Sequence, residues 1–330
     1  MIVPRLEARL KKAGLDRYMM VLILTVLLAT FLPAQGEFAD VLSHVTFWAV
    51  SLLFFLYGAK LPTATIISGL SNWKLQISVL LCTFAVFPLL GLAIAPVAAL
   101  WLPGAIGLGF LYIGCLPSTV QSSIAFTSIS NGNVSGAICA ASISNLVGVV
   151  LSPLLFASLM PQGAGYEVEP AAIWRIIQQI LLPFIVGQFC RPLLSNFLNR
   201  HKMPTMIVDR GSILLIVYSA FSAGVVNGIW QVISYQSLAI LIALCMLYLA
   251  VVLAITIFVA KAARTNRADL LALFYCGSTK SLATGLPMAG ILFAGKDISL
   301  IVMPLMLFHL IQLVVCALIS QGHAAQAQAA

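Results

Sequence analysis

A single lysine stands in the middle of a long apolar run of this chain. Lys280 is the thirteenth residue of the run 268–294. It would be roughly 20 Å from either end if the run is helical, so its side chain cannot reach a water interface. A lysine at the centre of a membrane costs about 2.5–3.5 kcal/mol, and no mid-span Asp or Glu is available to pair with it. Backbone carbonyls, loss of a proton or a bound anion must therefore compensate the charge. We favour a functional role for Lys280, and the structural alternative is that it permanently ties the carbonyl ends of broken helices.

Lys280 belongs to one of two polar clusters that interrupt apolar runs. A proline accompanies each cluster, Pro117 in the run 104–129 and Pro287 in the run 268–294. A broken helix frees N–H and C=O groups that hydrocarbon cannot satisfy, so two breaks in corresponding places indicate a protein-lined transport site. The alternative is that Ser and Thr bond back to their own helix and that proline only kinks it. The candidate residues are Ser118, Thr119, Gln121, Ser122 and Ser123 in the first cluster and Ser278, Thr279, Lys280 and Ser281 in the second.

Polar residues in other apolar runs add further candidates. Ser142 and Asn145 stand at i, i+3, so they share one helix face, where they either glue neighbouring helices together or form a wall of the site. His309 and Gln312 have the same spacing, which favours hydrogen bonds between helices over a proton relay. Thr83 is uninformative by itself.

The composition excludes a water-soluble globule. Of the 330 residues, 62% are hydrophobic and 8% are charged, whereas soluble domains have about 45–50% and about 25%. A bilayer core needs ~20 apolar residues per helix, so the apolar residues suffice for about ten spans. The formal charge of +8 more readily orients loops than attracts nucleic acid, because no basic face is present on which nucleic acid could lie.

Metal, redox and enzyme chemistry have little support in the sequence. The seven cysteines are odd in number, form no CxxC pair and lie in or beside apolar stretches, as small membrane hydrophobes do. Neither an HExxH pattern nor a GxSxG nucleophile elbow occurs, so neither a metal nor a cofactor is predicted. Lys280 could serve as a Schiff-base lysine, but it lacks a partnered base or nucleophile. An enzyme is therefore not expected.

Apolar runs separated by polar or Pro/Gly punctuation predict the helices that must position the clusters. The basic N-terminus and a weak small-residue end, PAQG, raise the question of a signal peptide, but we expect the first helix to stay uncleaved. The predicted spans are 18–33, 41–59, 76–95, 104–129, 133–160, 171–190, 209–228, 235–260, 268–294 and 298–320.

Lys and Arg are distributed unevenly around these spans. Fourteen of them lie at the N-terminus and in the connections after the second, sixth and eighth spans. The opposite side has Arg175 and Lys296, together with acidic residues. By the positive-inside rule both termini are cytoplasmic, which requires an even number of spans and agrees with ten.

The two halves of the chain share a pattern. SLLFFLYGA at 51–59 matches SILLIVYSA at 212–220, an offset of 161, and Ser118-Thr119 recurs as Ser278-Thr279, an offset of 160. Because each half has five spans, the second half enters the membrane from the opposite face. The sequence therefore predicts an all-α polytopic membrane protein with ten transmembrane helices in two inverted five-helix repeats, residues 1–160 and 161–330, whose fourth and ninth helices are broken.

Several stretches of the chain, within residues 14–320, resemble one known family. They are SLLFFLYGAKL, FLYIGCLPSTVQSSIAFTSISNGNV, SPLL, SAFSAGVVNGIW, CGSTKSLATGLPMAGILF and MPLMLFHLIQLVVCA. They resemble the bacterial SBF-like proteins, the branch of the bile acid:sodium symporter superfamily that includes its seventh vertebrate member. The resemblance implies a panel domain (helices 1, 2, 6 and 7) and a core domain (helices 3–5 and 8–10). It also implies substrate and ion sites where the broken fourth and ninth helices cross.

The sodium site of the family carries over only in part. The resemblance implies a Ser-Asn pair in the fourth helix and a Glu followed by Gly, Met and Gln in the ninth. Here Ser122-Ser123 stands near the first position, and Tyr275 replaces the acidic sodium ligand. Thr83 matches an assisting glutamine of the third helix. Because no carboxylate remains to hold Na⁺, the ammonium of Lys280 can take the electrostatic role of a bound Na⁺.

Together these features predict a secondary transporter of a small organic anion that works by alternating access and is not conventionally sodium-coupled. Helix N-termini at the breaks carry positive dipole ends, which favour an anionic substrate. The protein would lie in the lipid bilayer of the bacterial inner (cytoplasmic) membrane with both termini in the cytoplasm. The alternatives are a sodium- or proton-coupled symporter of bile-acid-like substrates and a non-transporting regulatory or assembly protein. The oligomeric state does not follow from the sequence.

Overall fold

The computed structural model describes residues 17–60, 72–160, 174–226, 228, 233–293 and 298–329, and the regular structure of these residues is all helical. Each predicted apolar run coincides with one helix or with consecutive helices. Two shorter apolar helices cover Met20–Phe31 and Gly104–Cys115. Within the described residues, seven helices are long and apolar enough to cross a membrane, which makes this a multi-pass membrane protein: Glu37–Lys60, Trp73–Ala99, Val134–Leu159, Trp174–Leu198, Lys202–Val226, Tyr235–Ala262 and Ile298–Ala324.

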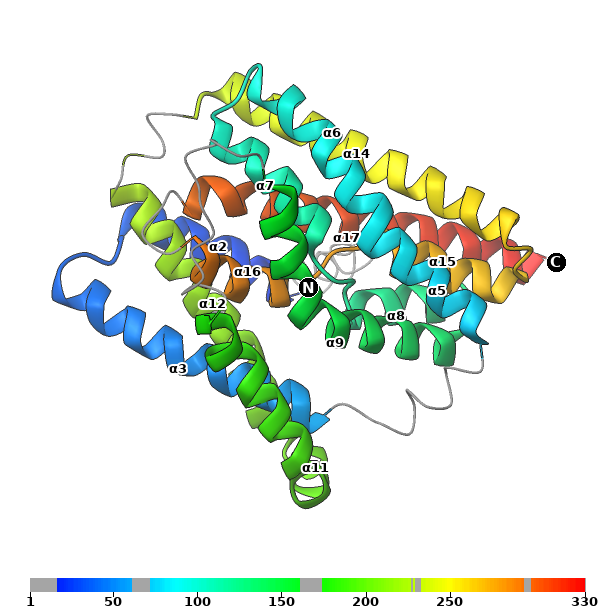
Figure 1. The fold of residues 1–330 in the computed structure, drawn as a ribbon, viewed down its shortest axis with the longest axis horizontal. Helices are drawn as coiled ribbons and strands as arrows, with labels where there is room; N and C mark the ends of the chain where they lie inside the picture. The colour runs from blue at the N-terminus through cyan, green and yellow to red at the C-terminus, as the bar shows by residue number, and fades with distance from the viewer. Residues whose placement is uncertain are drawn as a thin grey trace, which may run out of the picture.

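A smaller group of helices packs together at one side of the molecule, at the lower left of Figure 1. The α3 helix contacts both α11 and α12, and α2 contacts α12. We call this set the four-helix group. Its members are α2 (Arg17–Phe31), α3 (Glu37–Lys60), α11 (Leu182–Arg200), which continues the π-helix η3 (Ile177–Leu181), and α12 (Lys202–Val226).

The remaining helices form a larger group around the two predicted breaks. Helix α7 packs against α6 and α17, and α15 packs against α14, α8 and α5. The two groups meet where α12 contacts α16 and α17 and where η3 contacts α9. The members of the larger group are α5 (Trp73–Leu81), η2 (Cys82–Val86), α6 (Phe87–Ala99), α7 (Gly104–Cys115), α8 (Gln121–Ile129), α9 (Val134–Leu159), α14 (Tyr235–Ala262), α15 (Arg267–Ser278), α16 (Leu282–Leu292) and α17 (Ile298–Ala329).

Two glycines allow the closest helix approach in the four-helix group. A Cβ added at Gly58 of α3 would overlap the carbonyl oxygen of Phe184 in α11. A Cβ added at Gly187 of α11 would overlap the carbonyl oxygen of Phe55 in α3. Because lipid offers no hydrophobic drive between helices, close backbone packing of this kind is a main source of association.

Some helices extend beyond the predicted apolar runs. Helix α12 begins at Lys202, whereas the prediction started at residue 209, and α17 reaches Ala329, beyond the predicted end at 320. The first residue of the predicted run is held against α3: Tyr57 Oη donates to Asp209 Oδ1 at 3.0 Å, and Lys60 Nζ lies 3.8 Å from Asp209 Oδ2. Apolar content marks the membrane part of a helix, but the helix continues as long as its backbone bonds and packing persist.

A buried carboxylate joins three elements at one end of the larger group. Asn266 caps α15 by accepting a hydrogen bond from Asp269 N at 2.8 Å. Asp269, 8% exposed, accepts from the side-chain amides of Asn72, Asn133 and Asn266 at 2.9, 2.6 and 3.1 Å. This cluster fixes the start of α5 and the start of α9 against the start of α15.

Candidate substrate and ion site at two helix breaks

Two predicted helices are each broken in the middle. Helix α7 ends at Cys115 and α8 begins at Gln121, and the residue after α7, Leu116, is extended with ψ 155°. Helix α15 ends at Ser278 and α16 begins at Leu282, and the intervening Thr279 and Ser281 have ψ 150° and ψ 110°.

The two breaks lie against each other. Ser281 N donates to Pro117 O at 2.9 Å, a direct backbone bond from one break to the other. Ser118 Oγ donates to Cys276 O at 2.6 Å. Two polar clusters that are about 160 residues apart in the sequence therefore form one polar centre.

Hydroxyl groups from both breaks form a connected cluster. Thr119 Oγ1 lies 2.6 Å from Ser122 Oγ and 2.7 Å from Ser123 Oγ. It also lies 3.1 Å from Thr279 Oγ1 of the other break. Ser118 Oγ and Ser123 Oγ lie 3.4 and 2.8 Å from the same Thr279 oxygen. The structure thus brings together five of the candidate residues, and Thr119 and Thr279, one from each break, each touch three other members.

The ammonium of Lys280 is fully buried and surrounded by carbonyl oxygens. Lys280 Nζ donates to Thr83 O at 2.8 Å, Gly114 O at 2.9 Å and Leu116 O at 2.5 Å. The ring centroid of Phe87 lies 4.1 Å from the same nitrogen, a cation–π distance. Lys280 makes no ion pair with a carboxylate among the residues that the structure describes. Of the three compensations open from the sequence, the structure shows backbone carbonyls.

Two prolines explain why these carbonyls are available. Residues 82–86 adopt π-helical bonding, in which each N–H donates to the carbonyl five residues earlier, as Phe87 N does to Cys82 O. The next donor would be residue 88, but Pro88 has no N–H, so the carbonyl of Thr83 is left for Lys280. At the other position, Pro117 ends the helix, and Ser118 N donates to Ser144 Oγ at 3.0 Å instead of to Gly114 O.

The long helix that follows each broken helix, α9 or α17, forms hydrogen bonds with the backbone of the break. Gln312 of α17 accepts from Lys280 N through Oε1 at 2.8 Å and donates to Lys280 O through Nε2 at 2.8 Å. In α9, Ser144 Oγ accepts from Ser118 N, and Asn145 Nδ2 donates to Ser118 O at 2.7 Å. The expectation that Gln312 bonds between helices is confirmed. His309 Nδ1 lies 2.8 Å from Gln312 Nε2, so it supports the same amide group.

Other candidate residues lie apart from the hydroxyl cluster or bond elsewhere. Ser278 Oγ donates to Phe274 O at 2.5 Å, which is the bond to its own helix that the structural alternative foresees. Ser281 Oγ accepts from Thr284 N at 3.2 Å and caps α16. Asn145 Oδ1 accepts from Thr284 Oγ1 at 2.9 Å. Gln121 is exposed at the start of α8.

The residues with which α9 and η2 contact the breaks differ from the predicted ones. The sequence predicts that Ser142 and Asn145 share the helix face toward the site. The hydroxyl that contacts the first break instead belongs to Ser144, one residue before Asn145. Thr83 contributes its carbonyl to Lys280, and its buried hydroxyl has no hydrogen-bond partner among the described residues. The sequence marks Gln312 as a polar residue inside an apolar run. The carbonyl groups that bind Lys280 Nζ carry no such side-chain signal.

Tyr275, which the resemblance aligns with an acidic sodium ligand, does not direct its hydroxyl toward the hydroxyl cluster. Tyr275 Oη lies 2.8 Å from Ser130 Oγ and 3.1 Å from His323 Nδ1. Its carbonyl accepts from Thr279 Oγ1 at 2.8 Å. Within the described part of the chain, no group of three His, Cys, Asp or Glu side chains is arranged to hold a metal ion.

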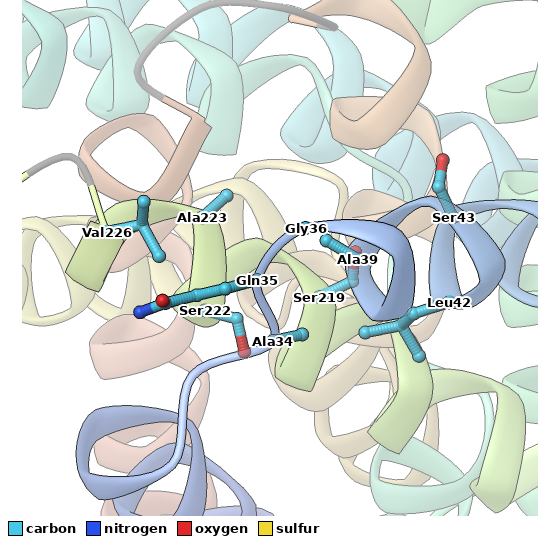
Figure 2. A pocket seen from close by; sticks show the side chains of 10 residues that line it. All are labelled: Ala34, Gln35, Gly36, Ala39, Leu42, Ser43, Ser219, Ser222, Ala223 and Val226. Carbon is cyan, nitrogen blue, oxygen red and sulfur yellow. The ribbon is translucent and has the colours of Figure 1, made fainter.

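A separate hollow of about 420 Å³ lies in the four-helix group, where the α2–α3 connection faces the end of α12 (Figure 2). Its polar lining consists of Gln35, Ser43, Ser219 and Ser222, and the rest is small or aliphatic. None of the candidate residues at the breaks lines this hollow, so it is distinct from the polar centre.

The model of the SBF-like CPA transporter family matches residues 16–325 of the chain. The chain belongs to this family. SBF-like proteins of this family are transporters, so the two broken helices lie in a carrier and not in an enzyme.

Relatives of this SBF-like transporter occur in bacteria and vertebrates. It is 47% identical over 311 residues to "Uncharacterized protein PA2026" of Pseudomonas aeruginosa, covering 94% of this chain and 93% of the relative. It is 43% identical to "Putative symporter YfeH" of Escherichia coli, covering 95% and 94%. It is 29% identical to "Sodium/bile acid cotransporter 7-B" of Xenopus laevis, covering 87% and 85%. The likeness to relatives with a transporter name therefore extends over nearly the whole chain.

Proposed function

We propose that this protein is a secondary transporter of a small organic anion that works by alternating access. The observation that carries the proposal is the backbone bond from Ser281 N to Pro117 O, which joins two helix breaks in a member of a transporter family. Irregular backbone at membrane depth is tolerated where it is buried in protein or lines a water-filled cavity. In transporters such breaks adjoin substrate and ions.

Two inverted five-helix repeats, residues 1–160 and 161–330, account for the arrangement of the breaks. Thr119 and Thr279 are equivalent at the offset of 160, and their hydroxyl oxygens lie 3.1 Å apart, as expected next to a pseudo-twofold axis. Equivalent Ser51 and Ser212 each donate to the carbonyl four residues earlier. The repeats would give ten spans when the interrupted pairs α7–α8 and α15–α16 each count as one.

In this proposal the four-helix group is the panel and the larger group is the core. The panel would comprise helices 1, 2, 6 and 7, and the core helices 3–5 and 8–10. The contacts within each group together outweigh those between the groups, which α12 makes with α16 and α17 and η3 makes with α9, and this suits rocking of one body against the other.

The substrate would meet the start of α8. Gln121 is exposed and Ser122 is half-buried, whereas Thr279 and Lys280 are fully buried. The N-cap residue Val120 offers no side-chain cap to α8, so the first N–H groups of this helix and its positive dipole end can face an anion. Lys280 would act through its field, because its three ammonium hydrogens already bond to carbonyls.

Sodium coupling is not expected at this centre. Hard cations take oxygen ligands, and the ligand that would bring negative charge is absent because Tyr275 stands at its position and directs its hydroxyl to Ser130. The name of the vertebrate relative reports sodium and bile acid for that protein. Sodium- or proton-coupled transport of bile-acid-like substrates is thus the second candidate, and the coupling measurement below decides between them.

The proposed orientation places both termini in the cytoplasm of a bacterial inner membrane. Connections assigned to the same side lie together in the structure, which supports the alternation of spans. Lys60 pairs with Asp209, and Asn72 and Asn133 both donate to Asp269. All five residues belong to connections or helix ends assigned to the cytoplasm.

The proposal is tested by ligand screening and by flux. Anionic metabolites would be screened against the purified protein by thermal unfolding, with and without Na⁺, because a ligand that binds the native state raises its apparent stability. Flux of each hit into proteoliposomes then separates a carrier from a regulatory or assembly protein with the same fold. Binding without any flux of the hit would overturn the transport proposal.

A further inference from the structure

The ammonium of Lys280 has a complete coordination shell made by the fold. A lysine ammonium carries three donors and no acceptor. The three donors of Lys280 meet three backbone carbonyls, of Thr83, Gly114 and Leu116, at 2.5–2.9 Å. No side-chain charge takes part.

These carbonyls are oriented by other contacts than their bond to Lys280. The Thr83 carbonyl lies in the π-helical turn that precedes Pro88, and this turn is stabilised by its own backbone bond from Phe87 N to Cys82 O. Gly114 is the second-last residue of α7, so its carbonyl belongs to the helix end. Leu116 is held beside Pro117, whose carbonyl accepts from Ser281 N. The three oxygens should therefore keep their positions when the lysine side chain is removed.

The shell has the character of a monovalent-cation site. Rings of neutral carbonyl oxygens replace the hydration shell of monovalent cations in membrane proteins. The ring of Phe87, 4.1 Å from the nitrogen, adds a face that attracts cations and tolerates alkyl groups. The shell contains no acidic oxygen, which suits a single positive charge and not a divalent ion.

We infer that this carbonyl shell is a binding site for a small monovalent alkylammonium or ammonium ion, which the chain fills with its own Lys280. The inference rests on the shell alone and does not depend on what the protein transports. Lys280→Ala would remove the tethered ammonium and most of its stem. Free methylammonium could then place its nitrogen among the three carbonyls and its methyl group in the space of the missing stem.

The test is thermal unfolding of purified Lys280→Ala in ammonium, methylammonium or tetramethylammonium chloride at equal ionic strength. Ammonium and methylammonium should raise the unfolding midpoint by about 2–4 °C in a saturable manner, because a ligand that binds the native state stabilises it. Tetramethylammonium should give no such rise, because it has no N–H to donate.

Three matched proteins serve as controls. In the wild type the shell is filled, and in Lys280→Met an apolar chain of similar length occupies the space, so neither should respond selectively. Lys60→Ala removes one positive charge elsewhere and should also show no difference between the salts. A selective response in any of these controls would assign the effect to another place.

A second measurement applies if Lys280→Ala is poorly folded. Membranes would then be solubilised in each salt, and recovery of monodisperse protein in methylammonium but not in tetramethylammonium would support the site. Equal recovery or equal midpoints in all salts would overturn it. Failure to recover folded Lys280→Ala in any salt would overturn it as well, because the shell would then not persist without its lysine.

Discussion

Gln312 Oε1 accepts from Lys280 N at 2.8 Å, and Gln312 Nε2 donates to Lys280 O at 2.8 Å, so one side chain of α17 pairs both backbone groups of a residue 32 positions earlier. Lys280 lies between α15 and α16, so its backbone N–H and C=O have no partner within a helix. The primary amide of Gln has one acceptor and two donors, so it can replace both missing partners at once.

Gln312→Leu should therefore destabilise the folded protein without adding a charge or a large change in volume. Gln312 is 0% exposed, so the N–H and C=O of Lys280 would be left buried and unpaired, at about 1–3 kcal/mol each. The measurement is thermal or chemical unfolding in detergent. Gln178→Leu, at an exposed position before α11, is the control and should have little effect. A Gln312→Leu protein with wild-type stability would show that the clamp is dispensable.

Variants at the breaks should separate residues that face the substrate from residues that hold the breaks together. Gln121→Ala and Ser122→Ala should reduce binding or flux by about tenfold or more while the unfolding midpoint stays near that of the wild type, because these side chains are exposed or half-buried. The hydroxyl of Thr279 contacts three others and a carbonyl, so Thr279→Ala should lower flux and stability together.

Thr279→Ser keeps the hydroxyl and should restore stability relative to Thr279→Ala. Loss of folded protein in Gln121→Ala and Ser122→Ala as well would favour a structural role for the whole cluster.

The positive charge of Lys280 should be required, and sodium should not be. Transport or binding of the anion should be equal in Na⁺ and K⁺, because the centre has no carboxylate to hold sodium. Lys280→Met should abolish function, since it removes the charge and leaves three carbonyls without donors. Lys280→Arg should retain activity if a fixed charge suffices and lose it if the lysine must release a proton, because guanidinium stays protonated. A wild-type flux that needs a sodium gradient would contradict this.

Two glycine substitutions in the four-helix group should change the free energy of unfolding in opposite directions. Gly187→Ala places a Cβ against the carbonyl oxygen of Phe55, and overpacking of this kind costs about 1–3 kcal/mol. Gly211→Ala, in α12, meets no atom within 4 Å and should stabilise by up to about 1 kcal/mol, because Ala is the better helix former. Unfolding of both variants under the same conditions gives the comparison. Similar midpoints would mean that α3 and α11 can move apart at no cost.

The orientation can be tested with reporter tags. Tags at both termini and at residues 200 and 264 should report the cytoplasm, and tags near 37, 166, 230 and 296 should report the periplasm, because fourteen Lys and Arg residues lie on the first side. Residues 166, 230 and 296 lie outside the described residues. A cytoplasmic signal at 166 alone would contradict the inverted repeat.

The sequence by itself determined the helices, the two breaks and the recurrence between the halves. A membrane helix satisfies its backbone locally, so an apolar run is sufficient to predict it, and each predicted run coincides with a helix or consecutive helices. Pro117 and the clustered hydroxyl residues marked the breaks for the same reason, since the loss of an N–H and local hydrogen bonding act within one turn. The offset of 160 in the sequence alone links Thr119 with Thr279.

Only the tertiary structure decided which groups meet at those breaks. The ligands of Lys280 are backbone carbonyls, which every residue carries, so no side-chain pattern could single out Gly114 or Leu116. Ser144, and not the predicted Ser142, contacts Ser118, because the contact depends on how α9 is rotated against the break. The uniformly apolar side chains of a membrane helix do not determine its rotation or its neighbours. These are fixed by close packing and hydrogen bonds with helices that are distant in the sequence.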